Sequence, residues 1–288
     1  MKKKSKPRLT ISLIGSGNLA QVLGPALRSA GYRIASVAAR NSRSSEKRAR
    51  ALARKLSAAA TRLEDGPPQA DVVWLCHTDD ALAETASRLA RRPGWKGTIV
   101  FHSSGALTSD VLAPLQQAGA HTASLHPMMT FVPGTQPQLK SVPFAVEGDR
   151  KAVAAARRIV ARLGGEIFEI EKNAKVLYHA LGSFSSPLLV ATLVTAERVG
   201  QGAGLSRAQT RRIIGPILAQ TLQNYMERSA AAAFSGPVQR GDLNTVRRHL
   251  RELKKVPEAS GVYRALVRSA LRDLPARHRT ELLKVLRG

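Results

Sequence analysis

Residues 9–20, LTISLIGSGNLA, decide the predicted fold of the first half of the chain. The apolar run over residues 9–14 predicts a buried strand, and a glycine-rich turn follows it directly. A helical stretch then ends near Gly31, and residues 33–39, RIASVAA, predict a second strand. A strand, a glycine turn, a helix and a strand within about thirty residues make up the βαβ unit that binds dinucleotides.

The small residues of this turn have the spacing that a pyrophosphate requires. Gly15 permits the tight turn, Gly17 lets the backbone approach the phosphates, and Ala20 allows close packing of the helix on the strand. The N-terminus of the helix adds a positive partial charge. The alternative is a glycine turn that only joins two elements. We expect cofactor contacts from Gly15, Ser16, Gly17, Asn18, Leu19 and Ala20.

The end of the second predicted strand indicates which dinucleotide binds. An NAD site places Asp or Glu there, whereas this chain has Arg40, Asn41, Ser42 and Arg43 and no acidic residue before Glu46. Guanidinium groups and a hydroxyl suit the 2′-phosphate of NADP, because they form charge-assisted hydrogen bonds. These four residues are therefore predicted to bind NADP. The alternative is that the arginines only begin a solvated helix.

The rest of the chain predicts alternating strands and helices up to residue 170 and only helices after it. Further strands are expected at residues 71–76, 97–101, 120–125, 142–146 and 166–170. Helices are expected between them at 44–60, 79–91, 108–117 and 150–163, and beyond them at 173–199, 206–228, 242–255, 258–272 and 275–286. The alternation predicts an α/β fold with a doubly wound parallel sheet. We expect a basic tail at 1–8, an NADP-binding Rossmann domain at 9–170 and an all-helical domain for substrate and dimerisation at 171–288.

Composition narrows the class of protein. The chain has 288 residues, enough for two domains, and 43% of them are hydrophobic, as in globular proteins. No apolar run is expected to reach the roughly 20 residues of a membrane helix, so no membrane partner is predicted. The single cysteine, Cys76, excludes an intrachain disulfide and any multi-cysteine metal site. A cytoplasmic protein is expected.

The charge is unusual, because 45 Lys and Arg against 20 Asp and Glu give a net +25. Nucleic acid is one explanation, since phosphates are neutralised by basic side chains. The basic residues are, however, scattered at helix-surface spacing, and aromatic residues are only 4%, too few for a stacking platform. We expect a solvated basic surface that favours a small anionic substrate, with nucleic acid disfavoured as a partner.

Polar side chains follow three neighbouring predicted strands at their carboxyl ends, where such sheets bind ligands. They are His77-Thr78 after one strand, Ser103-Ser104-Gly105 after the next and His126 after the third. We expect them to converge on the nicotinamide end of the cofactor. The histidines lack the close helical spacing of zinc ligands, so no metal site is predicted. Each segment could instead only end a strand or cap a helix.

Motifs spread along the chain carry a family resemblance. They are GSGNLA at 15–20, FHSSGAL at 101–107, SLHPMMTF at 124–131, KVLYHA at 175–180 and FSGPVQRGD at 234–242 with Thr245 and His249. In combination they resemble the family that joins a Rossmann-like domain to a DUF2520 domain, related to 6-phosphogluconate dehydrogenases, ketopantoate reductases and pyrroline-carboxylate reductases. The resemblance implies an NADP oxidoreductase with a helical C-terminal domain, commonly a homodimer, and leaves the substrate open.

Two narrower resemblances suggest roles for single residues. His126-Pro127-Met128 is similar to the segment of prephenate dehydrogenases whose histidine acts at the substrate hydroxyl. Lys175 stands where β-hydroxyacid dehydrogenases and ketopantoate reductases have a catalytic lysine, but His179 replaces the asparagine that follows in those proteins. His126, Lys175 and His179 are therefore the candidate acid–base residues. Lys175 as a surface lysine and His179 as a packing residue form the alternative.

Residues 234–242 predict a loop that enters a helix. Helix capping would explain Asp242 and Thr245, but it would not require Arg240 or His249. We therefore expect Arg240, Asp242 and His249 in the substrate-binding wall. The whole pattern predicts an NADP(H)-dependent oxidoreductase that moves a hydride between nicotinamide and a small C=O or C=N compound, such as a 2-keto acid. The alternative is an NADP(H)-binding sensor without turnover.

Overall fold

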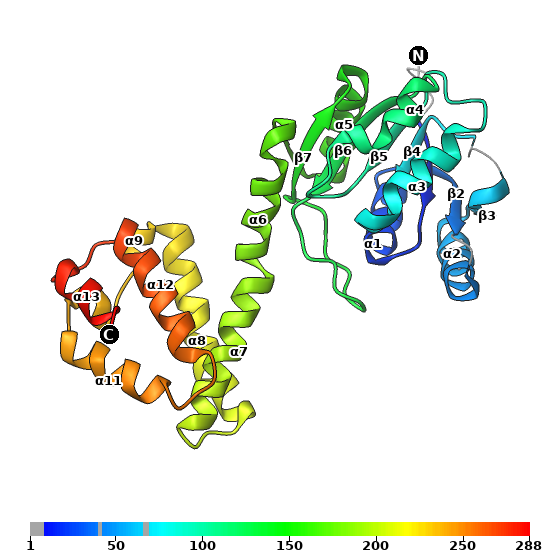
Figure 1. Cartoon of the computed structure of the whole chain (residues 1–288). Coiled ribbons are helices and arrows are strands. Elements are labelled where there is room, and N and C mark those ends of the chain that lie inside the picture. The colour runs from blue at the N-terminus through cyan, green and yellow to red at the C-terminus, as the bar shows by residue number, and fades with distance from the viewer. Residues whose placement is uncertain (1–8, 40–41, 66–68) are drawn as a thin grey trace, which may run out of the picture. The chain divides into compact units, whose positions relative to one another are not determined.

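The computed structural model describes residues 9–39, 42–65 and 69–288. It divides into two compact units, Met1–Ser183 and Phe184–Gly288, which are treated separately below. Figure 1 shows the sheet in the first unit and the bundle of helices in the second. The predicted tail at residues 1–8 and the predicted cofactor residues Arg40 and Asn41 lie outside the described residues.

An eight-stranded sheet forms the centre of the first unit. Its strands are β1 (Thr10–Ile14), β2 (Arg33–Ala39), β3 (Ala59–Arg62), β4 (Val72–Leu75), β5 (Ile99–His102), β6 (His121–Pro127), β7 (Pro143–Gly148) and β8 (Glu166–Glu169). Their order is β3-β2-β1-β4-β5-β6-β7-β8. The predicted α/β class with a doubly wound, mostly parallel sheet is thus confirmed.

One pair of strands departs from the predicted parallel arrangement. β7 runs antiparallel to β6, with His126 paired with Ala145, while the other neighbouring pairs are parallel. A parallel neighbour requires a crossover connection, usually a helix, and residues 128–142 contain none. The chain therefore turns back beside β6.

The two faces of the sheet are covered by different helices. Leu13, Trp74 and Phe101 pack on one face with α1 (Asn18–Ser29), α2 (Arg43–Leu56) and α5 (Arg150–Leu163). Val73 and Leu75 pack on the other with α3 (Asp79–Ala90) and α4 (Ala113–Gln117). Successive residues of a strand point to opposite faces, so apolar strands such as β4 are buried on both sides.

β3 is a strand where the sequence pattern predicted the end of a helix. α2 stops at Leu56, because Ser57 adopts a left-handed conformation with φ of 51°. The four residues of β3 read AATR, and three of them are exposed at the edge of the sheet. Alanine and exposed polar residues carry no strand pattern, so only the pairing with β2 reveals this strand.

The second unit contains α7 (Pro187–Gly202), α8 (Arg207–Glu227), α9 (Ala230–Ala233), α10 (Pro237–Arg240), α11 (Leu243–Leu253), α12 (Ala259–Asp273) and α13 (Arg279–Val285). Residues 184–288 are all described, and they contain no strand, as predicted. Val246, Leu250, Val267 and Leu271 belong to their core.

The helix predicted at 173–199 is divided into α6 (Lys175–Ser185) and α7. Ser186 separates them, because Pro187 has no backbone N–H to continue the helix and occupies the first position of α7 instead. The stretch Lys172–Gly202 is long and apolar enough to cross a membrane, by length and composition alone. The expectation that no apolar run reaches this length is therefore wrong, since residues 176–196 include no Asp, Glu, Lys or Arg.

Candidate active site

The glycine turn joins β1 to α1 at the carboxyl edge of the sheet. Gly15 has φ of 109°, and a Cβ there would lie 2.7 Å from the carbonyl oxygen of Cys76, so a side chain is excluded. Gly17 is the N-cap residue of α1, and no described atom lies within 4 Å of its Cβ position. The turn therefore presents bare backbone and a helix N-terminus toward open space, which fits a pyrophosphate.

The other predicted residues of this turn support it. Ala20 is buried in the core, and the Ser16 hydroxyl donates to the carbonyl oxygen of Ser45 in α2 at 3.3 Å. Asn18 is exposed and its amide donates to the carbonyl oxygen of Phe131 at 2.9 Å. Leu19 is half-buried against the core. These contacts hold the turn, whereas the exposed Gly17 leaves it accessible.

The predicted 2′-phosphate residues lie at the start of α2, as far as the structure describes them. The Ser42 hydroxyl caps this helix by accepting from the backbone N–H of Ser45 at 3.2 Å, and Arg43 is exposed in its first turn. Arg62, which was not among the predicted residues, is placed by β3 beside the end of β2. Arg62 forms an ion pair with Glu46 at 3.1 Å. Without the unpredicted strand, nothing in the sequence indicated that Arg62 lies here.

The next two strand ends carry the predicted nicotinamide residues. After β4, His77 is half-buried with Nδ1 3.0 Å from the hydroxyl of Thr85, and Thr78 is exposed at the start of α3. After β5, Ser103 accepts from the indole N–H of Trp74 at 2.8 Å and donates to the carbonyl oxygen of Leu125.

The Ser104 hydroxyl also serves the turn after β5, because it accepts from the backbone N–H groups of Ala106 and Leu107. His102, fully buried, accepts from the Ser104 N–H at Nδ1, and its Nε2 lies 3.1 Å from the carbonyl oxygen of Thr108. Burial, and then Lys175, lower the pKa of His102 to about 3. A neutral His102 therefore holds the turn.

Lys175, at the start of α6, is not a surface residue. Its side chain is 1% exposed, and its ammonium group donates to the carbonyl oxygen of Ser104 at 3.0 Å and to the hydroxyl of Ser124 at 2.5 Å. Burial lowers its pKa to about 8, although Glu147 and Asp79 raise it in part. Lys175 thus connects α6 to the ends of β5 and β6.

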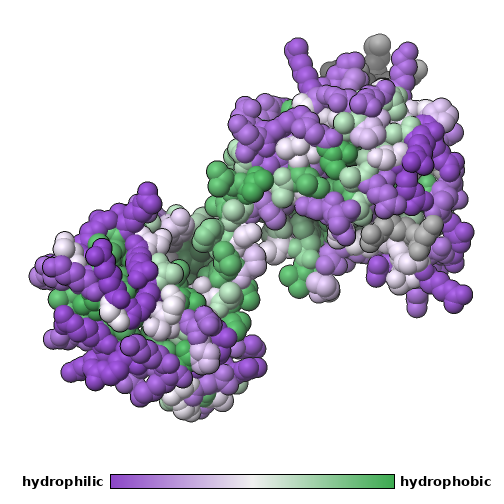
Figure 2. All heavy atoms as spheres, in the orientation of Figure 1, coloured by the Kyte–Doolittle hydropathy of each residue, from purple (hydrophilic) through white to green (hydrophobic). Residues whose placement is uncertain are grey.

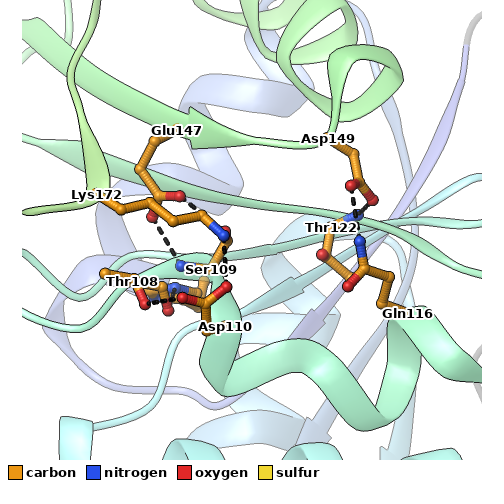
Figure 3. A network of polar contacts seen from close by, with 9 residues as sticks. Thr108, Ser109, Asp110, Gln116, Thr122, Glu147, Asp149 and Lys172 are labelled. Atoms are coloured by element: carbon orange, nitrogen blue, oxygen red, sulfur yellow. Dashed lines mark hydrogen bonds and ion pairs between the residues drawn. The ribbon is translucent and has the colours of Figure 1, made fainter.

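A network of polar contacts beside Lys175 holds the same elements together (Figure 3). Both carboxylate oxygens of Glu147 accept from Ser109, one from its N–H and one from its hydroxyl, at 2.7 Å. Lys172, just before α6, pairs with Asp110. Asp149 accepts from the backbone N–H of Thr122 at 2.7 Å. β6, β7 and the start of α6 are thereby fixed relative to the turn after β5.

His126, Tyr178 and His179 meet in front of Gly105. His126 Nδ1 lies 3.0 Å from the hydroxyl oxygen of Tyr178, and the two rings meet edge to face. The ring centroids of His126 and His179 are 6.2 Å apart. A Cβ on Gly105 would lie 3.0 Å from His126 Nε2 and 2.5 Å from His179 Cδ2. The absence of a side chain at Gly105 therefore keeps the two histidines close together.

Electrostatics keep His126 neutral near pH 7. Burial lowers its pKa to about 4, and the positive charge of Lys175 acts in the same direction. Burial raises the pKa of Tyr178 to about 12. Tyr178 was not among the predicted site residues, although it stands in the KVLYHA motif with Lys175 and His179.

The predicted substrate residues Arg240, Asp242 and His249 belong to the second unit. Asp242 caps α11 by accepting from the N–H and the hydroxyl of Thr245, at 3.0 and 2.7 Å, so capping accounts for it. Arg240 ends α10. His249 is exposed on α11, 3.3 Å from the hydroxyl of Tyr263, at a pocket of about 420 Å³.

The described residues hold no group of three His, Cys, Asp or Glu side chains placed to bind a metal ion. The chemistry available at the sheet edge is therefore that of a neutral imidazole, a phenol, a second histidine and a buried ammonium group. Such groups donate hydrogen bonds and move protons, next to a turn that fits a dinucleotide.

Comparison with protein families places two domains on the chain. Residues 2–127 match the Rossmann-like domain, and residues 142–270 match a domain of unknown function, DUF2520. No curated protein matches the sequence.

Solved structures share the fold over nearly the whole chain. A Bacteroides fragilis protein for which NADP oxidoreductase activity is suggested has 25% identity and a TM-score of 0.75, covering 91% of this chain and 97% of its own. Protein TM1727 of Thermotoga maritima has 24% identity and a TM-score of 0.71, covering 90% and 95%. An imine reductase of Myxococcus stipitatus in complex with NADP+ has 15% identity and a TM-score of 0.65, covering 91% and 94%. The similarities to TM1727 and to the imine reductase show a shared fold alone.

Proposed function

We propose that this chain, which joins a Rossmann-like domain to a DUF2520 domain, is an NADP(H)-dependent oxidoreductase acting on a small C=O or C=N compound. The observation that carries the proposal is the meeting of His126, Tyr178 and His179 in front of Gly105. This cluster lies at the carboxyl ends of β5 and β6, and the glycine turn lies at the carboxyl end of β1 in the same sheet. Ligands of such sheets bind along that edge.

The glycine turn and the start of α2 would hold the cofactor. Bare backbone at Gly15 and Gly17 suits the pyrophosphate, and Ser42 and Arg43 suit the 2′-phosphate. When bound, the nicotinamide supplies or accepts the hydride. NADP as cofactor also agrees with the imine reductase of the same fold that binds NADP+.

His126 is the group that we assign to the substrate. Its Nε2 lies 3.0 Å from the Cβ position of Gly105, at the carboxyl edge of the sheet, and a neutral imidazole there can donate a hydrogen bond to the oxygen or nitrogen of the reacting double bond. His179, whose Cδ2 lies 2.5 Å from the same Cβ position, is the second candidate for this contact. Lys175 donates two of its three N–H groups to Ser104 and Ser124, so the role that we assign to it is to position α6 and to contribute positive charge.

A positive field favours an anionic substrate, such as a 2-keto acid. The chain carries a net +25, and Lys175 lies beside the proposed reaction site. The decisive test is NADPH oxidation by the full chain with a panel of 2-keto acids and cyclic imines. Turnover with at least one member is expected. Tight NADPH binding with no turnover on either class would contradict the proposal and favour a non-catalytic sensor.

We also propose that the protein is a homodimer. In the first unit, α6 exposes Leu177 at 78%, and in the second unit α8 exposes Met226 at 73%. Figure 2 shows apolar surface over α6 and α7. Exposed apolar residues that gather on a helix face mark an interaction surface. A second copy of the chain is the proposed partner. A membrane is a poorer partner for α6, because Lys175 and Tyr178 tie that helix to the sheet.

Sedimentation at micromolar concentration tests the dimer. The expected result is a mass of twice 30.9 kDa, and Leu177→Glu should shift the population toward the monomer. Arg91→Glu, at another exposed position, is the matched control and should leave the mass unchanged. A strict monomer for the unmodified chain would contradict the proposal.

A further inference from the structure

We propose that Arg62, at the end of β3, binds the 2′-phosphate of the cofactor and makes the site prefer NADP(H) to NAD(H). The proposal rests on the proposed function for the place of the cofactor, and it adds a residue that determines cofactor specificity. A preference between two cofactors can be measured without any substrate.

The order of the strands indicates which part of the sheet receives the adenosine. The glycine turn follows β1, and the cluster around His126 lies at the ends of β5 and β6, on one side of β1. β2 and β3 lie on its other side. A dinucleotide with its pyrophosphate at the glycine turn and its nicotinamide near His126 must therefore extend its adenosine toward the ends of β2 and β3. The turn is joined to this side, because the Gly15 N–H donates to the carbonyl oxygen of Ala38 in β2 at 2.9 Å.

A pocket of about 250 Å³ lies where the adenosine is expected. Its walls come from the ends of β2 and β3 and from the first turns of α2, and they include Ala39, Glu46, Arg50, Arg62 and Asp65. Figure 1 shows α2 beside these two strands. In dinucleotide-binding sheets the choice between NAD and NADP is made near the end of this second strand. Ala39, the last residue of β2, is paired in parallel register with Arg62, so β3 brings a guanidinium group to that place.

The contacts of Arg62 leave its guanidinium group available to a ligand. Its Nε lies 3.1 Å from Oε1 of Glu46, and its side chain is 56% exposed. Among the described residues Glu46 is the only partner of this guanidinium group. Arginine carries five N–H donors, and its two terminal nitrogens can bind a phosphate through two parallel hydrogen bonds. The ion pair with Glu46 thus holds the side chain at the pocket while donors remain for a phosphate.

The charges around the pocket favour an additional phosphate. A second pocket of about 850 Å³ continues along α2 and shares Glu46 and Arg50 with the first. Together the two are lined by the basic residues Arg43, Lys47, Arg50, Arg54 and Arg62 and by the acidic residues Glu46 and Asp65. Glu46 is paired with Arg50 as well as with Arg62, and Asp65 accepts from the backbone N–H of Arg62 at 2.7 Å. The excess of positive charge suits a 2′-phosphate, whereas NAD has only a hydroxyl there.

Calorimetric titration of the full chain with NADPH and with NADH tests the proposal. Arg62→Ala should weaken NADPH binding about 5- to 10-fold and leave NADH affinity nearly unchanged, because only NADPH carries the 2′-phosphate. Arg62→Lys should show a smaller loss for NADPH, since lysine keeps the charge but not the paired donors. An unchanged NADPH affinity in Arg62→Ala, or an equal loss for both cofactors, would overturn the proposal and leave Arg62 as a surface ion pair.

Arg157→Ala is the matched control. Arg157, on α5, forms an exposed ion pair with Glu169 of β8, at the opposite edge of the sheet, so the variant removes the same charge and the same kind of contact. It should leave the ratio of the two affinities unchanged. An equal change of the ratio in Arg157→Ala would mean that net charge, not the place of Arg62, selects the cofactor.

The measurement separates this proposal from the proposed function. If no 2-keto acid or cyclic imine is turned over but Arg62→Ala lowers the ratio, the proposed reaction fails and the assignment of Arg62 stands. If a substrate is turned over and Arg62→Ala keeps the ratio, the assignment fails and the reaction stands. Absence of NADPH binding to the unmodified chain would overturn both.

Discussion

Two histidine–tyrosine pairs of nearly the same geometry occur in this chain, and their surroundings differ. His126 and Tyr178 lie at the edge of the sheet between Lys175 and His179, where burial lowers the pKa of His126 to about 4. His249 is exposed, and its partner Tyr263 borders an apolar pocket of the helical unit. The same contact therefore has different chemistry in the two places. The ring of His126 lies near the Lys175 ammonium group, whereas His249 is exposed to solvent.

The largest difference is expected between the two histidines. His126→Asn should lower kcat by about 10²–10⁴-fold, because it removes the group proposed to contact the reacting atom. His249→Asn should lower kcat far less. Steady-state kinetics with NADPH and the first substrate found would measure both, and NADPH affinity should be unchanged in each. Equal effects of the two variants would show that the sheet edge is not the reaction site.

The buried lysine should make stability depend on pH. Lys175 has a pKa of about 8 in the folded chain against 10.5 for an unperturbed lysine, so the unfolded chain binds more protons between these values. The free energy of unfolding should therefore rise between pH 8 and 10.5, by up to about 3 kcal/mol for this group.

Urea unfolding at several pH values measures this rise. In Lys175→Met the rise should be much smaller, because the group that titrates is absent. Lys284→Met, in the helical unit, is the control that should keep it. A rise that persists in Lys175→Met would mean that another group causes it.

Substitutions at two glycines distinguish an effect on packing from an effect on ligand binding. Gly105→Ala should destabilise the fold by about 1–3 kcal/mol and reduce turnover, because its Cβ would lie 2.5 Å from the His179 ring. Gly17→Ala should leave the melting temperature nearly unchanged and weaken NADPH binding, since its Cβ enters open space where the pyrophosphate is proposed to lie. Thermal melts and NADPH titration distinguish them. A lower melting temperature of Gly17→Ala would contradict the conclusion that the Cβ position of Gly17 faces open space.

The smallest effect is expected for the residues proposed to bind the 2′-phosphate at the adenosine end of the cofactor. NADPH should bind about tenfold more tightly than NADH, equal to about 1.4 kcal/mol, and Arg43→Ala should reduce this ratio. Arg247→Ala removes an exposed arginine from the helical unit and should leave the ratio unchanged. Fluorescence titration with both cofactors decides. An equal response to the two arginine variants would mean that general charge, not the start of α2, selects the cofactor.

The glycine turn was predictable because its requirements are local. A positive φ at Gly15, a bare Gly17 and an apolar strand before them are properties of neighbouring residues. The same holds for the doubly buried strand β4 and for Asp242, whose role as a helix cap depends on residues within one turn. The alternation of strands and helices then determined the fold class.

Features that depend on residues far apart in the sequence were revealed only by the tertiary structure. The direction of β7, the existence of β3 and the place of Arg62 all follow from strand pairing between segments far apart in sequence. From the sequence alone Lys175 could equally be a surface lysine, because its burial depends on Ser104, in the turn after β5, and on Ser124, on β6. Tyr178 became a site residue only when α6 placed it against His126. Short-range patterns thus determined where the cofactor turn and the helices lie, and long-range packing decided which side chains share one environment.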